Sequence, residues 1–306
     1  MSTASYSLTD LPIELLEEIT SHYPYPPTHP RYSRLQDKLL QRQRQDRLQI
    51  LRSLSQSCSL LRRAFLPLLW ERFYAHRTSF HQDDTTEAFV AHLFPYIKSV
   101  HIEMSWHRDT REPVFRFLRF LCTLPNLTGL HLHPVSRGLV PILSHAFSNV
   151  ILPTVTTLQT QGWMQPIFPS FPNVKTLTLP FPSRSLSDVT TSFPHLEAFS
   201  GLRVSVEMSL IEDLQSLPHL RALDIWSPVY LETAPLFARL GDLPHFSELS
   251  VVHDEGTKDA LSMDAMIQLC TSALRASESS YPKVLTVWHR KPDRIDVVPR
   301  TISLNS

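Results

Sequence analysis

The stretch LPNLTGLHL at residues 124–132 decides the fold, because variants of it recur along the chain. Each copy joins an apolar residue to a proline and then places apolar residues at the spacing of Leu127, Leu130 and Leu132. The other copies are FPYIKSVHI at 94–102, LPTVTTLQT at 152–160, FPNVKTLTL at 171–179, FPHLEAFSG at 193–201, LPHLRALDI at 217–225, LPHFSELSV at 243–251 and YPKVLTVWH at 281–289. The chain therefore contains an internal repeat of uneven length.

Each copy predicts a short strand, and the segments between copies predict helices. Apolar side chains two residues apart, such as Leu130 and Leu132, point to one face of a strand. The proline favours extended backbone at the residue before it and fits just outside a hydrogen-bonded ladder. Between copies, apolar residues follow the helical period, as over 114–121 and 266–273. Strands that alternate with helices predict an α/β fold with parallel strands.

The repeat resembles the strand segment L-x-x-L-x-L of the leucine-rich repeat family, from residue 93 to about residue 290. The turn residue of that family, Asn or Cys, is replaced here by Val135, Pro182 and Pro228. The resemblance implies an irregular leucine-rich-repeat-like solenoid at 83–290, followed by a C-terminal tail at 291–306. An ordinary parallel α/β sheet is the alternative, although the chain lacks the glycine motif of a nucleotide-binding version.

The N-terminal segment predicts three helices, at roughly 8–22, 47–62 and 65–74. The first, LTDLPIELLEEITSH, places Pro12 in the first turn, where its missing N–H costs nothing. Three blocks of this segment resemble the F-box family in order: LPIELL from Leu11, RSLSQSCSLLRRAF from Arg52, and PLLW, which ends at Trp70. We therefore expect a three-helix F-box at 8–75, interrupted by an insertion at about 23–47. The alternative is that the apolar stripes are only the core of a three-helix bundle.

The two resemblances together imply the substrate receptor of a cullin–RING ubiquitin ligase, with a layout similar to F-box proteins common in fungi. The F-box would bind a Skp-type adaptor and the solenoid would bind a target protein. A scaffold that uses the same adaptor without ubiquitination is the alternative. The residues expected to bind the adaptor are Leu11, Pro12, Ile13, Leu15, Leu16, Ile19, Leu51, Leu54, Cys58, Leu61, Leu66, Leu69 and Trp70.

The target is expected on the face of the strands opposite the buried leucines, because alternate strand residues point to opposite faces. Trp226 and Trp288 are candidate anchors there, since tryptophan is enriched among binding hot spots. The alternative for Trp288 is that it covers the edge of the last strand. The residues expected to line this face are His101, His131, His133, Gln159, Gln161, Thr178, Asp224, Trp226, Ser250 and Trp288.

Composition excludes several classes of function. Lys and Arg total 29, as do Asp and Glu, so no chain-wide nucleic-acid footprint is expected. Residues 31–77 are nevertheless basic, with 11 basic and 3 acidic side chains. This block is typical of a solvated helical or disordered segment, and an arm that binds RNA or an acidic partner is the sharper alternative.

The sequence contains no motif that indicates catalysis, a bound cofactor or a membrane span. No G-x-S-x-G or H-E-x-x-H motif occurs, and no cysteine or carboxylate near the strand histidines completes a zinc site. We therefore expect no enzymatic activity, no cofactor and no metal. The apolar runs are too short to span a bilayer and no secretory signal is visible. Three cysteines suit a reducing compartment, so the cytoplasm or nucleus is expected.

Overall fold

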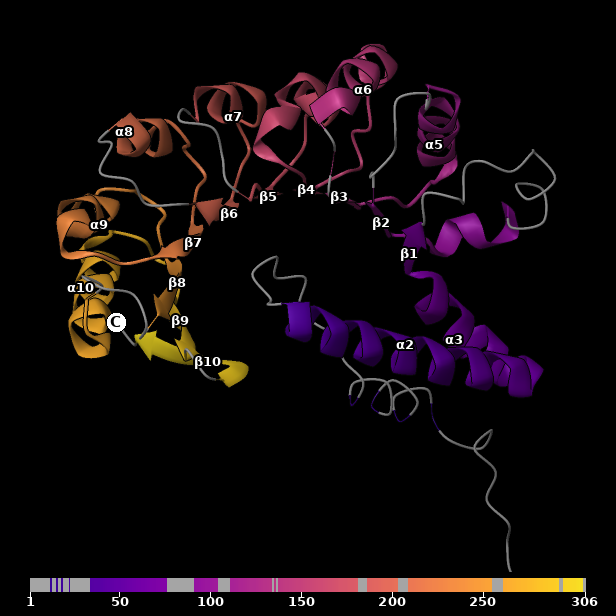
Figure 1. Cartoon of the computed structure of the whole chain (residues 1–306), viewed down its shortest axis with the longest axis horizontal. Helices are drawn as coiled ribbons and strands as arrows, with labels where there is room; N and C mark the ends of the chain where they lie inside the picture. The colour runs from indigo at the N-terminus through magenta and orange to yellow at the C-terminus, as the bar shows by residue number, and fades with distance from the viewer. Residues whose placement is uncertain are drawn as a thin grey trace, which may run out of the picture.

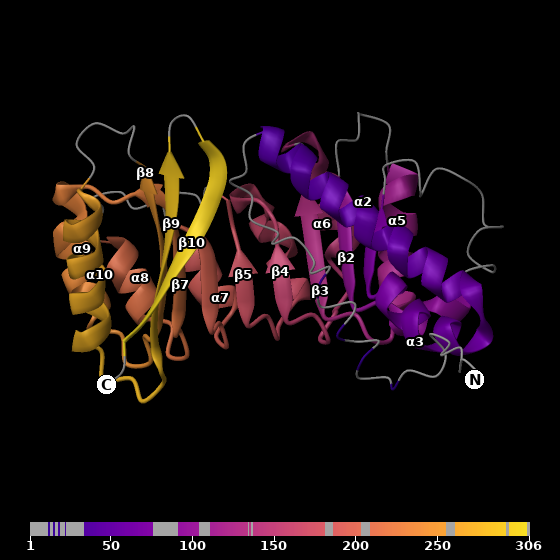
Figure 2. The ribbon, with the colours of Figure 1, turned by 90° about the horizontal axis from the view of Figure 1, so that it is seen from below.

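The structure is a computed structural model of the chain, and it shows an arc of strands with helices on the outer side (Figure 1). Strands line the inner, concave side of the arc, and one long helix runs across the hollow of the arc (Figures 1 and 2). The residues that it describes are 12, 15, 18, 22, 34–75, 91–103, 111–133, 135, 137–180, 186–202, 209–254, 261–291 and 294–304.

The described strands form one ten-stranded sheet whose order follows the sequence from β1 to β10. Neighbouring strands from β1 to β9 pair in parallel, and β10 pairs antiparallel with β9. The strands are β1 (Arg72–Ala75), β2 (Ser99–Glu103), β3 (Gly129–His133), β4 (Thr157–Gln159), β5 (Thr176–Thr178), β6 (Ala198–Leu202), β7 (Ala222–Pro228), β8 (Glu248–Asp254), β9 (Lys283–Lys291) and β10 (Arg294–Leu304).

The crossovers between the parallel strands are helical and lie on the outer side of the arc (Figure 1). Their α-helices range from six residues in α7 to 14 residues in α10, so the uneven repeat lengths are absorbed outside the sheet. The helices of the crossovers are η3 (Ala91–Tyr96), α5 (Arg111–Thr123), η4 (Arg137–Leu139), α6 (Val140–Phe147), η5 (Gly162–Ser170), α7 (Ser187–Ser192), α8 (Ser209–Gln215), η6 (Leu231–Thr233), α9 (Ala234–Leu240) and α10 (Met263–Ala276).

The core is built from the apolar positions of the repeat. Each strand places one apolar residue in register with the next, from Val100 through Leu177 to Leu285. These side chains are at most 2% exposed and pack against the apolar stripes of the outer helices. The whole row is Val100, Leu130, Leu158, Leu177, Phe199, Leu223, Leu249 and Leu285. The predicted inward–outward alternation of the strands is therefore what holds the sheet on its helices.

Backbone hydrogen bonds fix where each strand enters the sheet. The N–H groups of Thr128 and Gly129 both donate to the carbonyl of Lys98 in the preceding repeat, at 2.8 and 2.9 Å. The same pairing recurs at the entries of the following parallel strands. In two repeats the asparagine after the proline adds a side-chain bond, from Asn126 Nδ2 to the carbonyl of Pro95 (2.7 Å) and from Asn173 Nδ2 to that of Pro153 (2.9 Å). Asparagine therefore links repeats at the entry of the strand, whereas leucine-rich repeats would place it after the strand, at the positions of Val135 and Pro182.

Gly201 allows β6 to bulge. Its φ is +101°, and a Cβ at this position would lie 2.2 Å from the carbonyl oxygen of Leu179. The pairing register between β6 and β7 shifts between Ser200 and Leu202 at this point. Only glycine adopts such backbone without strain, so a scarce residue is used where the neighbouring chain approaches closely.

The N-terminal helices differ in their bounds from the predicted ones. Helix α2 (Arg34–Ser57) is one helix of 24 residues that contains the second half of the predicted insertion. Cys58 interrupts the helix with extended backbone, and its Sγ accepts the N–H of Leu61 at 3.5 Å as the cap of α3 (Ser59–Trp70). Pro67 therefore lies inside α3 and not at the start of a separate helix at 65–74.

The sheet extends further at both ends than the sequence indicated. The end of the predicted third helix forms β1, which pairs with β2 through registers such as Tyr74 with His101. The predicted C-terminal tail at 291–306 holds β10, which pairs along β9 and so covers its edge. Trp288 consequently does not cover the edge of a last strand, because Pro299 of β10 lies beside it.

Two separate hydrophobic cores exist among the described residues. The larger core runs along the whole sheet and its outer helices. The smaller one holds Leu51, Leu61 and Phe65, with half-buried neighbours from α2 and α3. The two are joined through aromatic contacts, in which Phe73 stacks on Trp70 at 6.3 Å and meets Phe120 at 5.1 Å. The α2–α3 pair is therefore a helical unit with its own core, attached to the beginning of the sheet.

Candidate functional site

The first block of predicted adaptor contacts lies at the surface where the structure describes it. Pro12 is exposed and Leu15 is 49% exposed. Leu15 lies in helical backbone, and its N–H donates to the carbonyl of Pro12 at 3.1 Å. An exposed leucine at this point is consistent with a contact surface. Four further predicted contacts, Leu11, Ile13, Leu16 and Ile19, lie outside the described residues.

The second block of predicted contacts divides between the core and the surface of the helical unit. Leu51 is 1% exposed and Leu61 is 4% exposed, so both side chains form the small core between α2 and α3. They hold the helices together and do not face a partner. The remaining predicted contacts are half-buried and present part of their surface to solvent: Leu54, Cys58, Leu66, Leu69 and Trp70.

The first half of the inner face carries a column of stacked rings. Tyr74 of β1 stacks on His101 of β2 with ring centroids 4.7 Å apart, and His101 stacks on His131 of β3 at 3.9 Å. His131 Nδ1 lies 2.6 Å from Gln159 Oε1 of β4, and Ser99 Oγ lies 2.9 Å from His101 Nε2. The strand register brings these residues together, because each occupies an equivalent position of its repeat.

Burial keeps these histidines neutral. The pKa of His131 is lowered to about 4, mainly because its ring is removed from water, with positive neighbours acting in the same direction. The pKa of His101 is lowered further, again chiefly by burial and then by His131, Arg72 and Arg44. His133 has a lowered pKa for the same first reason. The column therefore presents uncharged rings at neutral pH.

Helix α2 passes in front of the first strands of the sheet, on the inner side of the arc (Figure 2). The guanidinium carbon of Arg44 lies 5.6 Å from the centroid of the Tyr74 ring. Arg47, one turn further along α2, is 7% exposed. The N-terminal part of α2 also approaches β10, so the helix reaches across the hollow of the arc (Figure 1). Part of the basic block, at Arg44 and Arg47, is thus packed against protein, which departs from the prediction of a solvated segment.

The second half of the inner face is hollowed. A cavity of about 340 Å³ lies over β6 to β9, and small side chains such as Ala198, Ala222 and Ser200 leave the space. Three predicted target contacts lie at this cavity: Asp224, Ser250 and Trp288. Trp288 Nε1 donates to Ser250 Oγ (2.9 Å), and Ser250 Oγ donates to Asp224 Oδ1 (2.7 Å). This hydrogen-bonded chain orders the wall of the cavity.

Trp226 is not the exposed anchor that the sequence predicted. It is 7% exposed, and its Nε1 donates to Asp224 Oδ2. Asp224 accepts hydrogen bonds from Trp226 and from Ser250, so the indole belongs to the polar network of the inner face. An alternation of strand residues indicates which face a side chain is on, but not how much of it neighbouring residues cover.

The remaining predicted target contacts are mixed. Gln159 is 3% exposed and is hydrogen-bonded to His131 of the ring column, whereas Thr178 is half-buried on β5. Gln161 lies after β4, and its Oε1 accepts the N–H of Val135, so it ties two loops together. Only part of the predicted surface is therefore available for contact.

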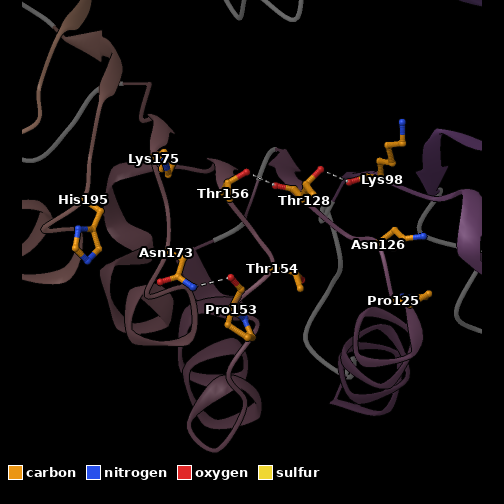
Figure 3. Close-up of a pocket in the computed structure, with 10 residues that line it drawn as sticks. All are labelled: Lys98, Pro125, Asn126, Thr128, Pro153, Thr154, Thr156, Asn173, Lys175 and His195. Atoms are coloured by element: carbon orange, nitrogen blue, oxygen red, sulfur yellow. Dashed lines mark hydrogen bonds between the residues drawn. The ribbon is translucent and has the colours of Figure 1, made fainter.

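The edge at which the strands begin carries a groove that the sequence analysis missed. The groove has a volume of about 650 Å³ and runs past Lys98, Thr128, Thr156 and Lys175 (Figure 3). Lys98 Nζ lies 3.2 Å from Glu71, and Lys175 Nζ lies 2.8 Å from Glu197, whose pKa is lowered chiefly by the bond to that lysine. The recurring proline and asparagine of the repeat were the available signal, because they form this edge.

The described residues hold no candidate metal site, and their buried cysteine belongs to the core. No group of three His, Cys, Asp or Glu within them is placed to hold a metal ion. Cys270 is buried, and burial raises the pKa of its thiol to about 12, so it is a core residue and not a nucleophile. Within the described ranges, no helix combines the length and apolar composition that a membrane crossing requires.

Comparison with known proteins supports one part of the chain. No curated protein matches it. A protein-family model described as an F-box-like domain matches residues 2–93, a range that contains α2, α3 and β1. F-box domains act in protein–protein interaction, typically with Skp-type adaptors. The N-terminal third of this chain is therefore an F-box-like domain, joined to a long and mostly parallel sheet.

Proposed function

We propose that the chain is the substrate-recognition subunit of an SCF-type (Skp adaptor–cullin–F-box) E3 ubiquitin ligase. The match of an F-box-like domain to residues 2–93 is the observation that carries this proposal. The domain contains the first strand of a curved sheet whose inner face is polar and partly hollow. The domain binds the adaptor, and the sheet binds the target protein.

The sheet region is a degenerate leucine-rich-repeat-like solenoid in this proposal. Its support is the sequential order of the parallel strands and the apolar row that stays in register from β2 to β9. Each repeat contacts mainly its neighbours, as in other repeat architectures. Such arcs use their inner face for extended protein contacts, which fits a target-binding role.

The F-box-like domain is a three-helix F-box in this proposal, and its adaptor surface combines exposed and half-buried apolar side chains. Leu15 is the exposed member in the first block. Leu66, Leu69 and Trp70 supply the second part from α3, near the point where the sheet begins. Buried apolar anchors of this kind typically contribute about 2 kcal/mol or more to an interface.

The chain itself performs no chemistry in this account. Its effect is to raise the effective concentration of target lysines near a ubiquitin-charged enzyme held on the same assembly. The sparse cysteines agree with action in the cytoplasm or nucleus. Neither a cofactor, a metal, a nucleic acid nor a membrane has a part in it.

Target turnover tests the proposal. The chain and its Leu15→Asp variant are expressed with and without a cullin inhibitor, and captured proteins are quantified by mass spectrometry under proteasome inhibition. We expect adaptor and cullin to co-purify with the wild-type chain but not with Leu15→Asp. Targets captured by the wild-type chain should carry ubiquitin when the cullin inhibitor is absent and not when it is present. Capture of the same targets with unchanged turnover would favour the alternative, a scaffold that uses the adaptor without ubiquitination.

A further inference from the structure

The inner face of the arc already holds a helix of the same chain. Helix α2 belongs to the F-box-like domain, yet its N-terminal part crosses the hollow and reaches β10 (Figures 1 and 2). Arg44 lies over the Tyr74 ring at the end of the ring column formed by Tyr74, His101 and His131. A surface that is expected to receive a target is therefore occupied in cis.

The contact is built from flat groups and not from a hydrophobic core. A guanidinium lies over the tyrosine ring, and the rings behind it are stacked nearly parallel, with 10° between the planes of His101 and His131. Arginine stacks on aromatic faces because its planar group is weakly hydrated. The column behind Tyr74 consists of neutral histidines, so at neutral pH it carries no positive charge that would repel the guanidinium of Arg44.

The contact also contains unsatisfied polar atoms, which make it weaker than an ordinary interface. Arg44 Nε and Tyr74 Oη are buried, and neither has a hydrogen-bond partner within the described part of the chain. Each such atom costs free energy relative to exposure to water. The small core of α2 and α3 is separate from the core of the sheet. The Arg44–Tyr74 contact thus belongs to neither core, and its loss leaves the packing of both cores unchanged.

We propose that α2 is an internal occupant of the target-binding face, and that the target displaces it with a helix that lays an arginine on Tyr74. This inference rests on the proposed function, because it names the class of partner for the same face: a basic, amphipathic helix. The seated α2 is the reason for choosing this partner, since it shows which shape and which side chain the face accepts.

The charges around the column favour a partner with one stacked arginine. The arginines whose charge acts on His101 and His131 are Arg72 of β1 and Arg44 of α2. Within the described part of the chain, no carboxylate is among the groups whose charge shifts the pKa of these histidines. An incoming arginine replaces Arg44 at equal charge, so displacement does not need an additional counter-ion.

A labelled peptide of residues 34–57 tests the proposal on the full chain. Its binding is measured by fluorescence anisotropy against wild type, Arg44→Ala and the matched control Arg42→Ala, whose side chain is exposed on the same helix. We expect the peptide to bind Arg44→Ala about tenfold more tightly than wild type, because the internal competitor has lost its stacked group. Arg42→Ala is expected to bind like wild type.

One peptide variant and three variants of the chain examine the chemistry of the contact. A peptide with Arg44→Ala should bind the Arg44→Ala chain about tenfold more weakly than the native peptide does. In the chain, Tyr74→Phe should preserve peptide binding, since it keeps the ring and removes only an unpaired hydroxyl, whereas Tyr74→Leu should abolish the difference between the peptides. If Arg44→Ala aggregates, Arg44→Lys keeps the charge, loses the planar group and should show a smaller gain in the same direction.

The inference and the proposed function fail in different ways. Equal peptide affinity for wild type, Arg44→Ala and Arg42→Ala, or no binding to any of them, would overturn the internal-occupant inference. Neither result depends on an adaptor. Loss of the proposed function would instead show as failure of the wild-type chain to bind a Skp-type adaptor, whatever the peptide does.

Discussion

Acid is expected to destabilise the folded chain through its ring column. His131 has a usual pKa of 6.5 and a folded-state pKa of about 4, so the unfolded chain takes up a proton first as pH falls. Its contribution to stability is complete above pH 6.5 and is lost as pH falls towards 4. Each pKa unit corresponds to about 1.4 kcal/mol, so the whole shift is worth about 3 kcal/mol and the fall to pH 5 about 2 kcal/mol. The lowered pKa of His101 acts in the same direction.

Urea unfolding at pH 7.5 and pH 5.0 measures this effect. The wild-type chain should lose at least about 2 kcal/mol of unfolding free energy between the two values. His131→Gln, which cannot take up a proton, should lose about 2 kcal/mol less than wild type over the same interval. The control is His219→Gln at an exposed position. An equal pH slope in wild type and His131→Gln would refute the reasoning, because the titration would then arise elsewhere.

Three other substitutions and one deletion follow from the packing. Gly201→Ala should lower the unfolding free energy by more than about 1 kcal/mol, because the new Cβ meets the Leu179 carbonyl and the backbone has a positive φ. Thermal unfolding measures this loss, and Gly241→Ala, at a glycine without a positive φ, is the control for the backbone effect. Phe199→Ala should cost about 3–5 kcal/mol by the same assay, because it opens a hole in the apolar row. Trp226→Ala should lower the unfolding free energy by about 2 kcal/mol or more, because the indole is buried. If the variant instead keeps full stability but captures the target more weakly, the indole is a surface anchor and this prediction is wrong. Deletion of 34–44 should keep adaptor binding within tenfold but raise hydrogen exchange at Tyr74, and unchanged exchange would show that α2 does not protect the column.

The repeat could be read from the sequence because its signal is local. The spacing of Leu127, Leu130 and Leu132 imposes one buried face on a strand, and the structure places these residues in the core. Helices α5 and α10 were visible for the same reason, through apolar residues at helical period. Local patterns of this kind survive uneven repeat lengths, because the extra residues lie in the crossovers.

What the sequence did not indicate depends on contacts between distant segments. Strand β10 lacks the repeat's proline at its start and carries Pro299 within it, so nothing in its pattern predicts pairing with β9. Strand β1 is four residues long and follows an apolar helix without a break in composition. The polar Gln/Arg pattern of α2 is that of a solvated helix, and only the fold brings Arg44 onto Tyr74.

For the candidate site, the sequence predicted which face of the sheet each side chain lies on, but not how deeply it is buried. The face to which His101, His131 and Asp224 point follows from strand alternation, but their burial follows from what lies above them. Trp226 was predicted to be exposed and is covered, whereas Trp288 is half-buried at the hollow. The groove at the strand entries escaped because it is formed by backbone turns rather than by a recognisable set of side chains.

The affinity of the full chain for a purified Skp-type adaptor tests the central claim most directly. Calorimetry should show one-to-one binding for wild type and for Ile151→Asp, a control at an apolar residue that is 62% exposed on the sheet region. Leu15→Asp should bind at least about thirtyfold more weakly, because a loss of about 2 kcal/mol corresponds to that factor. Absence of wild-type binding, or undiminished binding by Leu15→Asp, would contradict the account.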